Sequence, residues 1–312
     1  MIIISRYEAD DQAPWDALVS RAKNATFLHF RNYMEYHADR FSDFSLVARE
    51  GQAIVALLPA HRVAERIVSH GGLTFGGFIT DNDTKLPEFT EIFDASIEFL
   101  RNNGIGSVDY RPVPAIYHRA PSQEDLYAFF RAGATVYHPT VFSVVDQAAR
   151  VKFQERRRRA VGKAEKSGLE VRESTEFTEF WNILSQRLST AFGTAPVHTL
   201  AEIEALRSQF PENIRLYCAY DGSQMVAGVL AFESDRVAKT QYIAGSDRGL
   251  ELGAVDLILS HLITAAYRDR AYVDLGSSES ADGLNPGLIQ QKEGFGARTV
   301  VQLRLLLQIP PK

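Results

Sequence analysis

Apolar and polar residues alternate through residues 44–49 and 52–63, on either side of the turn signal Gly51, and this period of two predicts half-buried strands. Strands joined by tight turns are also predicted at 214–220, 224–233 and 236–245. Residues 86–103 instead place apolar side chains three and four positions apart and stop at Gly104, which predicts a long helix with a glycine exit. Further helices are predicted at 14–23, 30–40, 123–132, 152–167, 178–190, 199–208, 252–269 and 286–292. Further strands are predicted at 2–7, 71–79, 108–110, 135–145, 169–172, 271–275 and 299–308. Strands and helices mixed in this order predict an α+β fold.

The same order of elements occurs twice along the chain. The first copy, residues 45–136, contains SLVAREGQAIVALLPA, GSVDYRP and FFRAGATV, and the second, residues 215–300, contains RLYCAYDGSQMVAGVLAF, AYVDLGS and KEGFGARTV. Asp109 falls opposite Asp274 in this comparison. A solenoid repeat is only about 20–50 residues long, so a repeat of this length predicts two tandem domains of one fold.

Length and composition fit two domains of ordinary size in the cytoplasm. With 312 residues, 45% of them hydrophobic, the chain can bury a core in each domain, and we expect the domains to span 1–147 and 148–312. The single cysteine, Cys218, lies in the apolar run LYCAY and is interpreted as a core residue, and a lone thiol suits a reducing compartment. The apolar start of the chain is short and soon followed by charged residues, so neither a signal peptide nor a membrane span is expected.

Charge and histidine spacing narrow the function classes. The net charge of −5 disfavours a general nucleic-acid binder. The eight histidines show neither an H-x-x-x-H pair nor a cysteine partner at ligand spacing, so no metal site is expected. Four arginines at 156–159 form a local basic segment, which is either a solvated helix face or a site for an anionic ligand. The sequence is compatible with a homodimer but does not require one.

A second anion site is predicted further along the chain. The strand that ends in QYIAGS continues into SDRGLELGA, residues 246–254, and then into a helix. Unpaired amide N–H groups and the positive end of the helix dipole gather at such a helix start, which favours an anion there. The residues that we expect to line this site are Ala244, Gly245, Ser246, Arg248, Gly249, Gly253 and Ala254.

This loop resembles the Q/R-x-x-G-x-G/A loop with which the GNAT acyltransferase superfamily holds the pyrophosphate of acyl-CoA. Arg248 and Gly253 stand at matching positions, whereas Glu251 replaces the middle glycine, where a carboxylate suits a pyrophosphate poorly. RRRRAVGKAEKSGLEV and GLIQQKEGFGAR resemble two signatures of the FemAB-like branch, in which two such domains occur in tandem. Since the resemblance covers nearly the whole chain, it implies two GNAT-like domains, each a mixed, mostly antiparallel sheet flanked by helices.

The resemblance also implies roles for particular residues. Acyl-CoA would be a co-substrate, and no cofactor would be permanently bound. In the FemAB-like branch, an arginine before the A-x-K-x-G run contacts the diphosphate of a nucleotide-linked acceptor. The corresponding position in this sequence is Arg158, and Arg159 is the alternative. The branch's lysine before the last glycine-rich turn, near the ester or thioester under attack, corresponds to Lys292.

Three functions stay open. MEYHADRF, SHGGLTFGGF and LNPGLIQQKEGFGAR resemble bacterial N-acyltransferases that move an acyl group from CoA to a nucleotide-linked amino sugar in surface polysaccharide biosynthesis, including lipopolysaccharide O-antigen and capsule. We favour this function. An aminoacyl-tRNA-dependent Fem-type transferase of peptidoglycan synthesis is the alternative, although the classic staphylococcal enzymes carry a long helical arm and residues 190–200 are only a short loop. A non-enzymatic nucleic-acid binder that uses residues 156–159 is the third.

The expected reaction is attack of a neutral amine on a thioester carbonyl. Positioning of the reactants contributes more to the reaction rate than a base does, and so does one amide donor to the oxyanion. This donor is expected near Ala244 or Gly245. His198 is a candidate base because an unperturbed imidazole has a pKa of about 6.5, but it also precedes the helix that Thr199 caps. Asp274 ends the apolar strand VDL and is a candidate to orient the amine or Lys292, while His70 and Glu279 are further candidates for the base.

Five further residues are expected to contact substrate. His70 precedes the glycine-rich segment of the first copy and would bind the sugar. Phe75, Gly76 and Gly77 follow it, and glycine lets a ligand approach the backbone closely. Tyr242, on the strand before the anion site, would hydrogen-bond the departing thiol or stack on the ligand.

Overall fold

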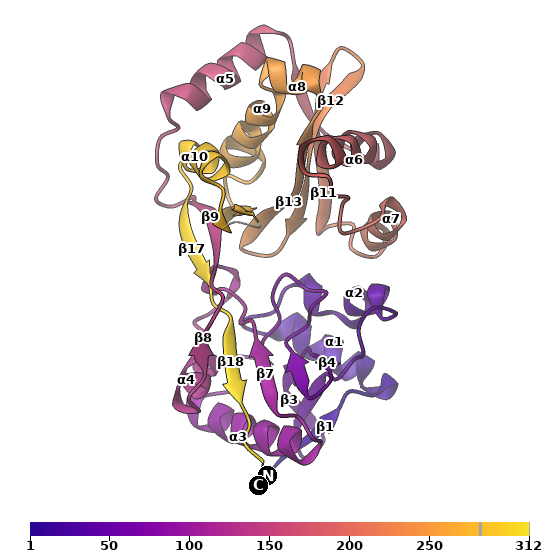
Figure 1. Ribbon diagram of the computed structural model, residues 1–312, viewed down its shortest axis with the longest axis vertical. Coiled ribbons are helices and arrows are strands. Elements are labelled where there is room, and N and C mark those ends of the chain that lie inside the picture. Colours follow the sequence, from indigo (N-terminus) through magenta and orange to yellow (C-terminus); the bar gives the residue numbers. More distant parts are fainter. Residues whose placement is uncertain (281–282, 312) are drawn as a thin grey trace. The chain divides into compact units, whose positions relative to one another are not determined.

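The structure is a computed structural model that describes residues 1–280 and 283–311. It contains two compact units: the N-terminal unit comprises Met1–Thr140 and Val301–Lys312, and the C-terminal unit comprises Val141–Val300. Figure 1 shows both units, coloured along the sequence. The compact units divide the chain at residues 140 and 300, because residues 142–146 pair within the C-terminal unit and residues 305–308 pair within the N-terminal unit.

A seven-stranded sheet forms the centre of the C-terminal unit, in the order β10-β11-β12-β13-β14-β9-β17. Strands β10 to β13 pair antiparallel, β13 and β14 pair parallel, and β14 and β9 pair antiparallel. The sheet is therefore mixed and mostly antiparallel, as predicted. Its strands are β9 Thr140–Asp146, β10 Glu170–Ser174, β11 Ile214–Asp221, β12 Gln224–Glu233, β13 Val237–Gly245, β14 Tyr272–Ser277 and β17 Arg298–Gln302.

Helices cover both faces of this sheet (Figure 1). On one face α9 packs against α5 and against β11, β12 and β13, and its apolar side chains belong to the core of the unit. On the other face α6 packs against β12 and β13, where Gly228 leaves room for the ring of Phe180. The helices are α5 Glu155–Lys166, α6 Phe177–Phe192, α7 Leu200–Gln209, α8 Asp247–Leu252, α9 Ala254–His261 and α10 Pro286–Gly294.

The N-terminal unit contains two sheets, β1-β2-β3-β6 and β4-β5-β7-β18-β8. Its core joins α3 and α4 to the second sheet, with Phe89 and Ile92 of α3 in one cluster with Val108 of β7 and Leu307 of β18. The strands are β1 Ile2–Arg6, β2 Leu46–Glu50, β3 Ala53–Leu58, β4 His61–Val63, β5 Arg66–Val68, β6 Ile79–Thr80, β7 Ser107–Tyr110, β8 Thr135–Val136 and β18 Leu305–Gln308. The helices are α1 Gln12–Arg21, α2 Arg31–Met34, α3 Leu86–Asn102 and α4 Glu124–Arg131.

Two strands lie in a sheet that the sequence repeat did not predict for them. Strand β9 follows the first copy but pairs with β14 of the C-terminal unit, and β18 follows the second copy but pairs with β7 of the N-terminal unit. The single strands predicted at 135–145 and 299–308 are each divided in two for this reason, since each part belongs to a different sheet. Each sheet is thus completed by a strand from the other half of the sequence.

The strand predicted at 71–79 is wrong. Only its last residue is extended and paired, in β6, because His70 and Gly77 have φ angles of 29° and 88°, which a strand cannot adopt. The strand predicted at 52–63 is divided into β3 and β4 at Pro59, where the missing N–H interrupts a ladder.

The two halves nevertheless share one arrangement. In the N-terminal unit, β5 and β7 are parallel and pair Val68 with Asp109. In the C-terminal unit, β13 and β14 are parallel and pair Lys239 with Asp274. Each parallel pair is followed by a strand that runs antiparallel to it, β18 in one unit and β9 in the other. The duplication predicted from the sequence is therefore present in the fold.

Candidate active site

The parallel strands β13 and β14 separate after a short paired stretch. Within the described residues their pairing ends with Lys239 opposite Asp274. Strand β13 then has a bulge at Gln241, since Thr240 and Tyr242 pair with consecutive residues of β12. A bulge bends its strand and increases the local twist, so the carboxyl ends of β13 and β14 diverge from this point.

Two lysines and an aspartate gather where the strands diverge. Asp274 is buried, and its carboxylate accepts a hydrogen bond from the N–H of Gly276 at 2.7 Å. Lys239 lies opposite it in the parallel register, and Lys292 extends from α10. The charge of Asp274 is close enough to raise the pKa of both lysines against the lowering effect of burial. The structure therefore brings together Asp274 and Lys292, as the sequence analysis expected for two catalytic residues.

Lys292 is an almost fully buried cation. Its side-chain Nζ donates to the carbonyl oxygens of Gly276 at 3.0 Å and Ser277 at 2.6 Å. Burial lowers its pKa from 10.5 to about 8; the charge of Asp274 opposes this shift and the charge of Lys239 adds to it. Because a free thiol has a pKa of about 8.5, the ammonium of Lys292 is matched to giving a proton to a departing thiolate.

A chain of polar side chains continues along β13 to the loop before α7. Lys239 Nζ donates to Gln241 Oε1 at 2.7 Å, and a hydrogen bond from Gln241 lowers the pKa of Tyr242, although burial raises that pKa more. The Tyr242 hydroxyl lies 2.6 Å from His198 Nδ1 and accepts the His198 backbone N–H at 3.2 Å. Since that oxygen already accepts from N–H donors, we assign its own proton to Nδ1, which leaves a neutral imidazole with its proton on Nε2.

His198 and Tyr242 are thus brought together by the structure. In this tautomer Nδ1 holds the hydrogen bond of Tyr242 and Nε2 already carries a proton, so the imidazole has no free basic nitrogen. The expected role of His198 as a base is therefore not favoured by its surroundings. Thr199, the next residue, caps α7 as expected, since its side chain accepts a hydrogen bond from the N–H of Glu202.

The segment expected to be an open anion-binding loop is mostly the short helix α8. Ser246 caps it by accepting the N–H of Gly249. A Cβ at Gly249 would lie 2.1 Å from the carbonyl oxygen of Val226, and a Cβ at Gly253 would lie 2.8 Å from that of Ala160. The two glycines are therefore required by close packing on β12 and on α5, independently of any ligand.

The first turn of α9 is also partly occupied by protein groups. Asp256, in this turn, is buried and forms an ion pair with Arg157 of α5 at 2.8 Å. Gln291 of α10 donates to the same carboxylate at 3.3 Å. A carboxylate near a helix N-terminus is stabilised by the helix dipole in the same way as a bound anion. Arg248, the other expected anion ligand, pairs with Asp221 at 3.1 Å on the surface.

The backbone of β13 offers outward-pointing amides. Ser246 N–H donates to Val226 of β12, and hydrogen-bonded and non-hydrogen-bonded residue pairs alternate in an antiparallel ladder. With the register of β12 and β13, this directs the N–H of Ala244 toward β12 and those of Ile243 and Gly245 away from it. Of the two oxyanion donors expected from the sequence, the geometry favours Gly245.

Helix α5 carries the basic residues of the junction on its exposed side. The side chains of Arg158 and Arg159 are 64% and 79% exposed, and both pair with Glu155. They line an open depression of about 490 Å³ together with Glu155, Gly162, Lys163 and Lys166. Because exposed ion pairs contribute little, about 0–1 kcal/mol, these arginines can be redirected to a phosphate at small cost.

The substrate residues expected in the N-terminal unit are buried. His70 packs against the rings of His37, His61 and Phe41, and burial lowers its pKa to about 3. Phe75 lies in the core against Tyr117. A Cβ at Gly76 would approach the Ser69 carbonyl oxygen to 2.6 Å, and one at Gly77 would approach the Tyr110 hydroxyl to 3.0 Å. Their contacts in the structure are with other protein groups.

Lys239, Gln241 and Asp256 were not found from the sequence, and Arg157 was named only as part of the basic segment 156–159. Lys239 could have been found from the repeat, since the parallel register that places Val68 beside Asp109 places Lys239 beside Asp274. Gln241 gave no signal, because a bulge changes the alternation by one residue without a glycine or proline to mark it.

Neither a metal site nor a membrane-spanning helix is present in the described residues. Between residues 1 and 280 and between 283 and 311, no group of three or more His, Cys, Asp or Glu side chains is arranged to hold a metal ion. In that part of the chain no helix has both the length and the apolar character needed to cross a membrane.

Comparison with known proteins identifies the domain type. Residues 151–282 match the family described as the acetyltransferase (GNAT) domain. No curated protein matches the sequence. Three solved structures are similar. FemX has a TM-score of 0.68 at 11% identity, with 98% of this chain and 97% of that chain covered. The C-terminal domain of a putative lysylphosphatidylglycerol synthetase from Agrobacterium fabrum has a TM-score of 0.62 at 12% identity, with 96% and 92% covered.

The third is a tandem GNAT protein from the clavulanic acid biosynthesis pathway, with a TM-score of 0.51 at 12% identity and 100% of both chains covered. At such low identity these similarities show the fold. They agree with the two copies of one α+β arrangement described above, and GNAT domains use acyl-CoA as co-substrate. The chain is therefore an acyltransferase with a tandem GNAT-like fold, and residues 151–282 contain its GNAT acetyltransferase domain.

Proposed function

We propose that this protein is an N-acyltransferase that moves an acyl group from acyl-CoA to the amine of a nucleotide-linked amino sugar in surface polysaccharide biosynthesis. The observation that carries this proposal is the buried ammonium of Lys292, beside Asp274 at the divergence of β13 and β14. A buried cation with a pKa of about 8 suits a thiol leaving group better than it suits a far more basic alkoxide.

In the proposed reaction the neutral amine of the acceptor attacks the thioester carbonyl carbon. The N–H of Gly245 holds the developing oxyanion, which is worth about 3–4 kcal/mol for one donor. As the tetrahedral intermediate collapses, the C–S bond breaks and the Lys292 ammonium gives its proton to the departing thiolate. The excess proton of the new amide nitrogen leaves to Lys292 or to water, so the charge balance is restored.

Tyr242 is the weaker candidate for this proton transfer. Burial raises its pKa above 10, so its proton would pass to a thiolate with a pKa of about 8.5 only against the equilibrium. The transfer from Lys292, with a pKa of about 8, is close to balanced. Tyr242 and His198 are therefore assigned to shaping the site.

The acceptor and the donor would be held at different surfaces of the C-terminal unit. The depression on α5 offers Arg158 and Arg159 for the diphosphate of the nucleotide sugar, because guanidinium forks form paired hydrogen bonds to oxyanions. Arg248 would turn from Asp221 to the CoA diphosphate, at a cost of no more than about 1 kcal/mol for an exposed pair.

Mass spectrometry of acceptors tests this proposal. The protein is incubated with a panel of acyl-CoAs and nucleotide amino sugars, and a gain of one acyl mass on one sugar is expected. The R158Q/R159Q variant should raise KM for the acceptor with a smaller effect on kcat. The matched control is R156Q, which changes an exposed arginine of the same helix that does not line the depression. If no sugar gains mass from any acyl-CoA, this function is wrong.

A second candidate, an aminoacyl-tRNA-dependent Fem-type transferase, is favoured by the α8–α9 segment. The ion pair of Asp256 and the packing of Gly249 and Gly253 occupy the place where a CoA diphosphate would be expected. Transfer from charged tRNA that is abolished by ribonuclease, together with no transfer from acyl-CoA, would select this candidate.

A further inference from the structure

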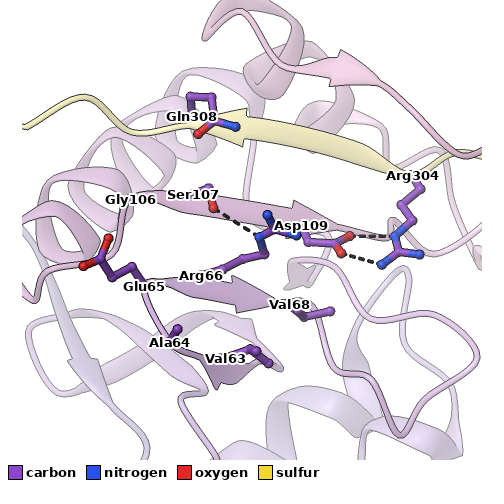
Figure 2. Close-up of a pocket in the computed structure, with 10 residues that line it drawn as sticks. All are labelled: Val63, Ala64, Glu65, Arg66, Val68, Gly106, Ser107, Asp109, Arg304 and Gln308. Carbon is purple, nitrogen blue, oxygen red and sulfur yellow. Dashed lines mark hydrogen bonds and ion pairs between the residues drawn. The ribbon is translucent and has the colours of Figure 1, made fainter.

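The N-terminal unit has a groove of about 590 Å³ that the transfer reaction does not use. It lies over the parallel strands β5 and β7 and the neighbouring β18, on the face away from the apolar core (Figure 2). Arg304 is at one end of the groove and Glu65 is at the other, with Arg66 between them (Figure 2). The lining residues are Val63, Ala64, Glu65, Arg66, Val68, Gly106, Ser107, Asp109, Arg304 and Gln308.

One buried carboxylate at the Arg304 end is bonded to Arg304 and lies near a second guanidinium group, that of Arg111. Asp109 is 1% exposed and accepts from Arg304 Nε at 2.8 Å and from a second guanidinium nitrogen. Residues 107, 109 and 111 alternate to one face of the strand, so Arg111 follows Asp109 on this face. Burial lowers the pKa of Arg111, Arg304 lowers it further and Asp109 raises it, which places all three charges close together.

In the described part of the chain, one side-chain donor of Arg111 lacks a hydrogen bond. This donor is Nε, which is buried. A buried donor without a partner is rare in native proteins and commonly marks an ion or water that completes the site. One carboxylate against two guanidinium groups also leaves a net positive charge, which a low-dielectric surrounding makes costly.

A third arginine extends this charge along the groove. Arg66 Nε makes one long hydrogen bond, 3.3 Å, to Ser107 Oγ and otherwise faces the groove (Figure 2). The groove is therefore lined by a firmly held guanidinium at Arg304 and an adjustable one at Arg66. Arg111, whose Nε lacks a partner in the described residues, is not a lining residue but lies close to Asp109 at the Arg304 end.

We propose that the Arg304 end of this groove is a binding site for an oxyanion group, phosphate or carboxylate, of a small ligand, which would contact Arg304 and Arg66 in the groove and reach the Nε of Arg111 beside Asp109. It occupies the register position that carries Asp274 and Lys239 in the other unit. An arginine keeps its proton at all ordinary pH values whereas a buried lysine does not. The N-terminal copy is therefore suited to bind an anion and not to transfer protons.

Calorimetric titration with pyrophosphate, inorganic phosphate and succinate tests this site. The protein used is the full chain with R158Q/R159Q, so that the basic depression on α5 does not contribute. One equivalent of a probe should bind. Tighter binding of phosphate or pyrophosphate would identify the ligand group as a phosphate, and tighter binding of succinate would identify it as a carboxylate. R111M should weaken binding at least tenfold and R66Q severalfold, whereas R62Q, on the neighbouring β4, should not change it.

Thermal unfolding keeps the test independent of folding defects. Because Arg111 Nε has no hydrogen-bond partner in the described part of the chain, adding R111M to the R158Q/R159Q protein should leave its unfolding midpoint without ligand unchanged or higher. The probe should raise the midpoint only of the protein that keeps Arg111. Saturable binding by none of the probes, equal binding by R111M, or a lower midpoint of R111M would each overturn the proposal. None of these results depends on the acyl transfer reaction.

Discussion

Asp109 and Asp274 occupy the same position in two parallel strand pairs, opposite Val68 in one unit and opposite Lys239 in the other. Both carboxylates are 1% exposed. Asp109 is matched by a direct ion pair with Arg304, while Asp274 lies in the field of two lysines. The N-terminal copy therefore holds at this point the permanent positive charge of Arg304. The C-terminal copy holds the positive charge of Lys292, which can be lost near pH 8.

The packing of α8 on β12 predicts a strong effect of a single methyl group. G249A places a Cβ 2.1 Å from the Val226 carbonyl oxygen, so we expect a loss of about 3 kcal/mol or more in the free energy of unfolding, as for overpacking against backbone. G162A, within α5, meets nothing within 4 Å and should stabilise the protein by about 0.5–1 kcal/mol. Urea unfolding of both variants measures the difference, and equal stabilities would contradict this packing.

The buried ion pair of Arg157 and Asp256 predicts an asymmetric result. D256N leaves a largely buried guanidinium without its counter-charge, so we expect a loss of about 3–5 kcal/mol. The matched control is D221N, which breaks the exposed pair with Arg248 and should cost less than about 1 kcal/mol. Chemical denaturation at neutral pH gives both values. A loss below about 1 kcal/mol for D256N would show that this pair does not anchor α9 to α5.

Removal of the Tyr242 hydroxyl should destabilise the protein more than it slows transfer. Y242F leaves His198 Nδ1 and the His198 backbone N–H without their partner, at a cost of about 1–3 kcal/mol. Y127F, at an exposed tyrosine of α4, should change stability by less than about 0.5 kcal/mol. We expect kcat of Y242F to fall less than tenfold, and a hundredfold fall in kcat would instead assign the proton transfer to Tyr242.

The pKa of Lys292 predicts how stability depends on pH. Its folded value of about 8 lies below the unfolded value of 10.5, so between these values the unfolded state binds more protons and stability rises with pH. The rise amounts to about 3 kcal/mol between pH 7 and pH 11. K292M should lack this rise, and K166M, at an exposed position of α5, should keep it. Parallel pH profiles for wild type and K292M would contradict the lowered pKa.

The duplication and the residues Asp274 and Lys292 could be predicted from the sequence. The third charged residue, Lys239, and the strands that complete the two sheets could not. Asp274 and Lys292 could be predicted from the repeat and from a family signature, which are properties of short segments. Lys239 depends on the register of a parallel pair formed over a long separation. Strands β9 and β18 are short, mostly apolar runs that could pair in either sheet, so no local pattern could place them.

The anion loop was predicted from glycines that are also required for packing. Gly249 and Gly253 are present because Val226 and Ala160 lie against them, and a glycine required for packing looks the same in a sequence as one required for a ligand. The ion pair beside this loop could not be predicted either, because Asp256 and its partner Arg157 lie far apart along the chain. Contacts between distant segments therefore set the limit of what the sequence predicts here.

The pH dependence of kcat for wild type and K292M tests the proposed chemistry most directly. With an acyl-CoA and an accepted amine, kcat of the wild type should fall as pH rises through about 8, because the ammonium of Lys292 is lost. K292M should lose about 10²–10⁴-fold in kcat and show no fall at that pH. A K292M enzyme with wild-type kcat and the same profile would contradict the assignment of Lys292 to the leaving thiolate.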